Sequence, residues 1–91
     1  MNGHKTITVA LADDHVLLRD ALAFLVNSFT NCQVLFTATN GQEVMDHIES
    51  GEYRDVIIMD LNMPIVDGHA TTRWLRDNHP QVHVMMLTMY D

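Results

Sequence analysis

The stretch that decides the fold is residues 56–68, which read VIIMDLNMPIVDG. Four consecutive apolar residues lead directly to an acid, Asp60, and turn-forming residues follow it. A short, Val- and Ile-rich run bounded by turn signals predicts a strand that is buried on both faces. Asp60 would then lie at the carboxyl end of that strand, where open α/β sheets bind their ligands. Because a buried carboxylate costs free energy unless it is paired, Asp60 is the first candidate functional residue.

Length and composition limit the chain to one domain. It has 91 residues, and 47% of them are apolar, which is enough for a hydrophobic core. Five basic against twelve acidic residues give a net charge of −7, which argues against a nucleic-acid surface on this segment. No apolar run approaches the ~20 residues of a membrane span, and the N-terminus lacks the apolar core of a signal peptide. The single cysteine, Cys32, excludes an internal disulfide and predicts a cytoplasmic location.

Strand and helix patterns alternate in the first half of the chain. Ile7–Ala12 is a β-branched apolar run, expected to be a strand buried on both faces, and it ends at the acid pair Asp13 and Asp14. Residues 33–37 predict a second strand. Between the two strands a helical period starts at His15. Its expected buried stripe has spacings of three and four and consists of Leu18, Ala21, Leu22, Leu25 and Val26.

Two more helices and a fourth strand follow. Asn40 opens a helix as a capping box in which the Glu43 side chain reaches back. Asp67 caps a third helix over residues 68–77. A fourth apolar run covers residues 82–88. The alternation predicts the α/β class with a parallel sheet and right-handed crossovers. The buried stripe of the third helix is expected to be Ala70, Trp74 and Leu75, or a neighbouring set.

Three carboxylates are expected at the carboxyl ends of strands, namely those of Asp13, Asp14 and Asp60. If the first and third strands are neighbours, these acids converge on one pocket. Two unit charges ~4 Å apart repel by about 4 kcal/mol at an effective dielectric of 20, so such a cluster needs a cation or a raised pKa. Hard oxygen ligands with open positions suit Mg²⁺. The alternative is that Asp13 and Asp14 only cap the first helix and that Asp60 only turns the chain.

These residues resemble the receiver domain of two-component response regulators. The resemblance covers nearly the whole chain and rests on the acid doublet with the Leu-rich helix after it, the D-x-x-M-P-x-x-D-G run that starts at Asp60, and residues 87–91, LTMYD. The region around the doublet looks most like regulators with a LuxR-type helix-turn-helix output. The resemblance implies that residues 1–91 form one flavodoxin-like (CheY-like) doubly wound parallel sheet with strand order 2-1-3-4.

The resemblance also implies roles for single residues. Asp60 is similar to the phosphoacceptor that attacks a phosphohistidine of a sensor histidine kinase, and Thr88 is similar to the switch hydroxyl that bonds a phosphoryl oxygen. Asp13, Asp14, Asp60 and the backbone carbonyl of Asn62 would hold Mg²⁺, with Asp14 as a direct ligand and Asp13 acting through water. The domain would be a signalling module rather than an enzyme. DNA would be contacted only through the output domain of a transcriptional regulator.

The sequence departs from the receiver pattern at its end. A receiver continues through a further helix, a fifth strand and a final helix, and the fifth strand opens with a lysine that bonds the phosphoryl group. This sequence ends at Asp91, and its lysine, Lys5, precedes the first strand. We therefore expect a shortened receiver whose competence for phosphorylation is in question. The fourth strand would have an open outer edge, and we expect a homodimer or larger assembly to cover it.

Two other functions compete with the signalling switch. A phosphohydrolase would also use a strand-end aspartate and Mg²⁺, but such families resemble D-x-D-x-T, and Asn62 stands where the second acid belongs. An assembly module without phosphotransfer would need neither the lysine nor a fifth strand. The six histidines show no ligand spacing such as H-E-x-x-H, so we expect surface or capping roles for them. Cys32 is expected to act as a small apolar residue.

Overall fold

The computed structural model describes residues 6–52 and 55–87. Within them, all strands are parallel and form one sheet in the order β2-β1-β3-β4. The predicted α/β class and strand order are therefore confirmed. Among the described helices, none has the length and apolar character needed to cross a membrane. The elements follow one another as β1 (Ile7–Ala12), α1 (Val16–Asn27), β2 (Cys32–Ala38), α2 (Gly41–Glu49), β3 (Val56–Asp60), α3 (Gly68–Asn78) and β4 (His83–Leu87).

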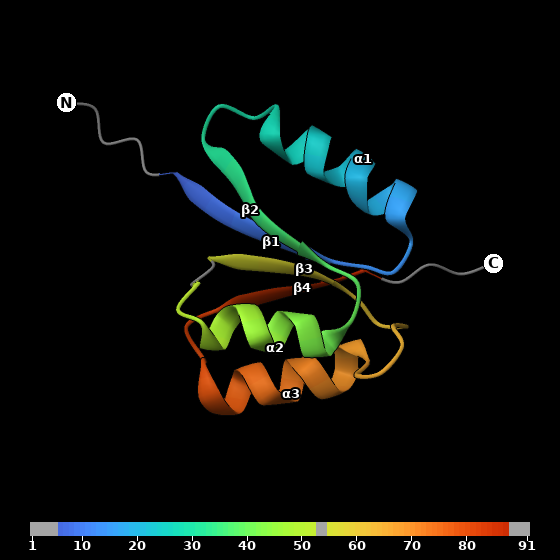
Figure 1. Ribbon diagram of the computed structural model, residues 1–91. Coiled ribbons are helices and arrows are strands. Elements are labelled where there is room, and N and C mark those ends of the chain that lie inside the picture. The colour runs from blue at the N-terminus through green and yellow to red at the C-terminus, as the bar shows by residue number, and fades with distance from the viewer. Residues whose placement is uncertain (1–5, 53–54, 88–91) are drawn as a thin grey trace.

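The helices cover the two faces of the sheet unequally. α1 lies on one face, against β1 and β2, whereas α2 and α3 lie side by side on the other face (Figure 1). The main hydrophobic core fills the space between the sheet and the α2/α3 layer. It consists of Ala10, Ala12, Phe36, Ala38, Val44, Ile48, Ile57, Met59, Met63, Leu75 and Val82.

The α1 face is less buried than the sequence predicts. No residue of α1 is buried, and in the expected stripe Ala21 is exposed and Leu25 is 53% exposed. The other stripe residues, Leu18, Leu22 and Val26, are partly buried. The prediction of a buried stripe is therefore wrong. Among the described residues, no second helix flanks α1 on this face of the sheet. Only the side of α1 that packs against the sheet is therefore shielded from solvent.

The same cause limits the burial of β3. Ile57 and Met59, which point to the α2/α3 layer, are fully buried, whereas Val56 and Ile58 on the α1 face are only partly buried. The prediction that this strand is buried on both faces is therefore wrong. For β1 the same prediction is confirmed over residues 9–12, because α1 covers the second face there.

The predicted helix caps are confirmed. The Asn40 side-chain oxygen accepts a hydrogen bond from the Glu43 N–H at 2.9 Å. The Glu43 carboxylate reaches back to the N–H of Thr39, at 2.8 Å, one residue earlier than in the usual capping box. The Asp67 side chain accepts from the N–H of Ala70 at 2.9 Å. These bonds satisfy backbone donors that the first helical turn leaves free.

The inner face of α3 is rotated slightly from the expected stripe. Its buried residues are Gly68, Thr71 and Leu75, whereas Ala70 and Trp74 are only partly buried. Thr71 can be buried because its hydroxyl donates to the Asp67 carbonyl at 2.7 Å, which satisfies the polar group. The correct member of the predicted set is therefore Leu75.

Candidate functional site

The register of the sheet brings the acids of two strands together. β1 and β3 are parallel neighbours, and Ala12 is paired with Met59. Asp13 follows Ala12, and Asp60 follows Met59, so the two carboxylates leave the same edge of the sheet from adjacent strands. This is the carboxyl edge, where parallel sheets bind ligands. The predicted convergence of the acids is confirmed by the positions of the strands.

The acids form a compact cluster that is buried on its inner side. One ligand atom from each of Asp13, Asp14, His15 and Asp60 lies within 4.8 Å of the others. Asp13 and Asp60 are each only 3% exposed, whereas Asp14 is exposed. One oxygen of each buried acid, Oδ2 of Asp13 and Oδ2 of Asp60, has no hydrogen-bond partner. A buried carboxylate oxygen without a partner carries an uncompensated desolvation cost, which a bound cation would offset.

His15 is the member of this cluster that was not predicted from the sequence. Its Nδ1 lies 3.0 Å from Asp13 Oδ1, 3.5 Å from Asp14 Oδ1 and 4.0 Å from Asp60 Oδ2. It is also the N-cap residue of α1, but its side chain makes no capping hydrogen bond. Instead, Asp13 Oδ1 accepts from the His15 N–H at 2.8 Å, which closes a local turn over residues 13–15. The signal in the sequence was its position directly after the acid doublet.

Burial, hydrogen bonds and the charges of the cluster shift two pKa values. Burial raises the pKa of Asp60 above its ordinary value, and the neighbouring charges of Asp13 and Asp14 act in the same direction. The hydrogen bond from the Asn62 N–H and the charge of His15 oppose this rise. The hydrogen bond to Asp13 raises the pKa of His15, and the charges of Asp13 and Asp14 add to it. Both shifts have the direction expected of a site with excess negative charge.

The loop after β3 holds Asp60 in place. The N–H of Asn62 donates to Asp60 Oδ1 at 3.2 Å, and the N–H of Gly68 donates to the Leu61 carbonyl at 3.1 Å. A Cβ added to Gly68 would lie 2.3 Å from the carbonyl oxygen of Asp60. Glycine is therefore needed here because the start of α3 presses against the backbone of the phosphoacceptor candidate, not because of a positive φ. The glycine that ends the D-x-x-M-P-x-x-D-G run is therefore required by a close backbone contact.

The predicted site residues differ in how the structure places them. Asp13, Asp14 and Asp60 are brought together as expected. Asn62 contacts Asp60 through its N–H, and the expected metal contact of its carbonyl stays a prediction. Thr88, the predicted switch hydroxyl, lies outside the described residues, although β4 reaches Leu87, which is paired with Asp60.

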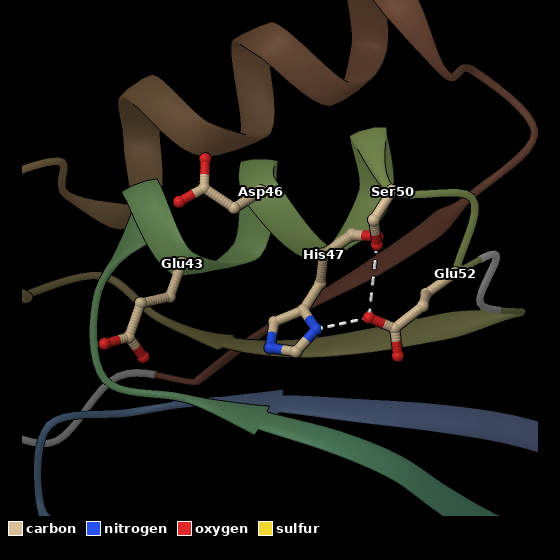
Figure 2. A pocket seen from close by; sticks show the side chains of 5 residues that line it. All are labelled: Glu43, Asp46, His47, Ser50 and Glu52. Carbon is tan, nitrogen blue, oxygen red and sulfur yellow. Dashed lines mark hydrogen bonds and ion pairs between the residues drawn. The ribbon is translucent and has the colours of Figure 1, made fainter.

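A second group of polar side chains lines a hollow beside α2. Figure 2 shows His47 and Ser50 pointing toward Glu52, with Glu43 and Asp46 farther along the helix. The set resembles a Ser-His-Glu triad in composition, but its hydrogen bonds differ from one. The Ser50 hydroxyl donates to the His47 backbone carbonyl at 2.7 Å, and the His47 ring is bonded to Glu52. Because the hydroxyl does not contact the imidazole, the group lacks the geometry of an activated nucleophile.

Comparison with known proteins identifies the family of this chain. The sequence pattern of the response regulator receiver domain matches residues 9–91. The transcriptional regulatory protein LnrK of Bacillus subtilis is 33% identical over 84 residues, covering 92% of this chain and 38% of LnrK. The oxygen regulatory protein NreC of Staphylococcus aureus is 33% identical over 85 residues, covering 91% of this chain and 38% of NreC.

A solved structure gives the same result. The crystal structure of a LuxR-family two-component response regulator from Aurantimonas sp. SI85-9A1 has a TM-score of 0.83 and 25% identity, covering 96% of this chain and 61% of that one. This chain spans well under half the length of LnrK and NreC. The 2-1-3-4 strand order is the one that the resemblance to this family predicts. The chain belongs to the receiver domains of two-component response regulators, of the NarL/LuxR type.

Proposed function

We propose that this receiver accepts a phosphoryl group on Asp60 from the phosphohistidine of a sensor histidine kinase. The observation that carries the proposal is the Asp60 carboxylate itself. It is 3% exposed, lies at the carboxyl edge of the sheet, and keeps one oxygen, Oδ2, without a hydrogen-bond partner. A buried carboxylate with one free oxygen, flanked by two further acids, fits a nucleophile better than it fits a structural turn residue.

The donor set fits Mg²⁺. Receiver domains generally bind Mg²⁺ at an acidic cluster. Here the unpartnered oxygens Asp13 Oδ2 and Asp60 Oδ2, the exposed carboxylate of Asp14 and the carbonyl of Asn62 would hold the ion, and all are hard oxygen donors. When bound, Mg²⁺ would neutralise the carboxylates and withdraw electron density from a phosphoryl oxygen.

The residues of the chain position the reacting carboxylate. The Asn62 N–H donates to Asp60 Oδ1 at 3.2 Å, which fixes the orientation of the carboxylate that attacks phosphorus. In the transfer, a bond forms between a carboxylate oxygen and phosphorus while the P–N bond to the kinase histidine breaks, and the imidazole leaves with the electron pair. The product is an acyl phosphate on Asp60. We assign to Thr88 the hydroxyl that then bonds a phosphoryl oxygen.

Phospholabelling of the purified chain tests this proposal. Incubation with Mg²⁺ and acetyl phosphate should add the mass of one phosphoryl group, measured on the intact protein. The adduct should be absent without Mg²⁺ and absent in Asp60→Ala. The matched control Asp77→Ala, which removes an exposed aspartate at the end of α3, should label normally. An unlabelled wild-type chain with a native circular dichroism spectrum would contradict the proposal.

The partners of the whole protein follow from its type. We propose a cytoplasmic sensor kinase domain as phosphodonor and a DNA-binding transcriptional regulator as the parent protein, as the relative named a transcriptional regulatory protein suggests. DNA would be contacted by an output domain. The net charge of −7 supports this division, because this segment would be repelled by phosphate.

An assembly role is the second candidate, and β4 is the observation that favours it. β4 is an edge strand of the described sheet, and Met85 on it is 58% exposed. An open edge with an apolar side chain favours pairing with a second copy. Light scattering at micromolar concentration should then report a homodimer that Met85→Lys weakens, with His83→Lys as the matched exposed control on the same strand. A stable, cooperatively folding monomer would contradict this role.

A further inference from the structure

The imidazole of His15 lies where a ligand of a bound cation would lie. It comes from the loop between β1 and α1, and its Nδ1 faces the carboxylates of Asp13, Asp14 and Asp60 at 3.0, 3.5 and 4.0 Å. Ligands that share one ion with bonds of about 2.0–2.2 Å are separated by roughly 3.0–3.4 Å from their neighbours. Two of the three distances are within about 0.1 Å of that range, and the third requires a small closing movement. The side chain is 65% exposed, so the ring has room to make it.

Two buried atoms point independently to a missing ligand. Oδ2 of Asp13 and Oδ2 of Asp60 have no hydrogen-bond partner, although both residues are only 3% exposed. Asp60 Oδ2 is the same oxygen that lies 4.0 Å from His15 Nδ1. The buried, unsatisfied oxygen and the imidazole nitrogen therefore face a common point. An ion at that point would satisfy both of them.

The chemistry of the donors depends on whether the imidazole takes part. Carboxylate and carbonyl oxygens alone suit Mg²⁺, whereas imidazole suits Zn²⁺, Ni²⁺ and other borderline cations. Four residues at this point offer three carboxylates and one imidazole. The same cluster can therefore present an all-oxygen set or a mixed set, depending on the ion.

We propose that His15 is a ligand through Nδ1 for a borderline divalent cation such as Ni²⁺ or Co²⁺, and that it is not a ligand for Mg²⁺. The proposal rests on the cation pocket of the proposed function and adds a determinant of which metal that pocket holds. A borderline ion held by His15 and the carboxylates occupies the oxygens that Mg²⁺ needs, so the two ions compete. His15 is in this sense a metal-selectivity residue of the phosphoacceptor site.

Calorimetric titration of the full chain with Ni²⁺ and, separately, with Mg²⁺ tests the proposal. The buffer is held near pH 8, above the ordinary pKa of histidine, because a ligating imidazole nitrogen must be unprotonated. Relative to wild type, His15→Ala and His15→Gln should weaken the Ni²⁺ affinity at least about tenfold, or about 1.4 kcal/mol, and change the Mg²⁺ affinity less than about threefold. His69→Ala, which removes an exposed histidine on α3, is the matched control and should leave both affinities unchanged. With Co²⁺, hyperfine-shifted imidazole proton resonances should be present in wild type and His69→Ala and absent in both His15 variants.

The outcomes separate this inference from the proposed function. Equal Ni²⁺ binding by wild type and the His15 variants, with Mg²⁺ binding intact, overturns the role of His15 and leaves the Mg²⁺ pocket in place. Loss of both metals in the folded His15 variants also overturns it, because His15 would then hold the carboxylates in position and not ligate. Absence of any binding by wild type overturns the inference and the proposed pocket together.

Discussion

Replacing Asp60 by asparagine should stabilise the metal-free chain at neutral pH. Asp60 and Asp13 are both nearly fully buried, and each has an oxygen without a hydrogen-bond partner. The substitution keeps an oxygen to accept from the Asn62 N–H and removes the charge. An amide nitrogen in place of the second oxygen could in addition donate to a neighbouring carboxylate. We therefore expect Asp60→Asn to have a higher free energy of unfolding than wild type.

The size of this gain follows from the spacing of the carboxylates. The ligand atoms of the cluster all lie within 4.8 Å of one another. Two unit charges at that separation repel by roughly 3.5 kcal/mol at an effective dielectric of 20. The nearby His15 imidazole and the solvent exposure of Asp14 offset part of the repulsion. We therefore expect Asp60→Asn to raise the free energy of unfolding by about 1–3 kcal/mol. Each kcal/mol raises the Tm of a domain of this size by about 4–8 °C.

The gain should depend on pH in a defined direction. Burial raises the folded-state pKa of Asp60 above its ordinary value of 3.8, so the folded chain holds the proton more tightly than the unfolded chain. That stabilising contribution is complete below the unfolded pKa and is lost as the pH rises through the folded pKa. The advantage of Asp60→Asn over wild type should therefore be near zero in acid and reach its full value at neutral pH.

Urea denaturation followed by circular dichroism, in buffer with a chelator, measures the difference. Asp77→Asn is the matched control, because it removes an exposed acid and should change stability by less than about 0.5 kcal/mol. Added Mg²⁺ should stabilise wild type by mass action and leave Asp60→Asn nearly unchanged, so the two curves approach each other. An asparagine variant that is no more stable than wild type in chelator at neutral pH would refute the view of Asp60 as an uncompensated buried charge.

Two further predictions concern the loop between β3 and α3. Ile65 has a φ of 68° and is 82% exposed. Ile65→Gly should relieve the left-handed strain, and because glycine also raises the entropy of the unfolded chain, the net gain in the free energy of unfolding should be about 0.5–1 kcal/mol. A lower Tm than wild type would contradict this prediction. Gly68→Ala places a Cβ 2.3 Å from the Asp60 carbonyl oxygen, which the backbone must relieve by moving. We expect a loss of about 2–3 kcal/mol together with weakened Mg²⁺ binding, measured by denaturation and calorimetry, and unchanged metal affinity would show that the loop adapts without moving Asp60.

The sequence predicts features that depend on a few adjacent residues. The caps at Asn40 and Asp67 need only a side chain three positions from its N–H, and both form as predicted. The convergence of Asp13 and Asp60 needs the strand order, which the alternation of elements and the family resemblance supply together. The caps are determined by local chemistry. The convergence of the acids is determined by the sheet topology, for which the rules of strand connection leave few alternatives.

Features that depend on distant neighbours were predicted less well. The burial of Leu25 depends on what lies beside α1, and the period of the helix contains no information about that. The place of His15 depends on a side-chain torsion and on β3 lying next to β1, so its spacing in the sequence matches no ligand motif. The need for Gly68 arises from contact with the Asp60 backbone, whereas a sequence pattern suggests only conformational freedom.

The uneven burial of the sheet determines which part of the molecule holds the site. Ala12 and Met59, the residues directly before Asp13 and Asp60, are 1% and 0% exposed and belong to the core under α2 and α3. The open parts are α1, where no residue is buried, and the β4 edge. Segments with few buried contacts open at lower free energy than the core does. Because Asp13 and Asp60 directly follow core residues, we expect the two carboxylates to keep their spacing when α1 or β4 opens locally.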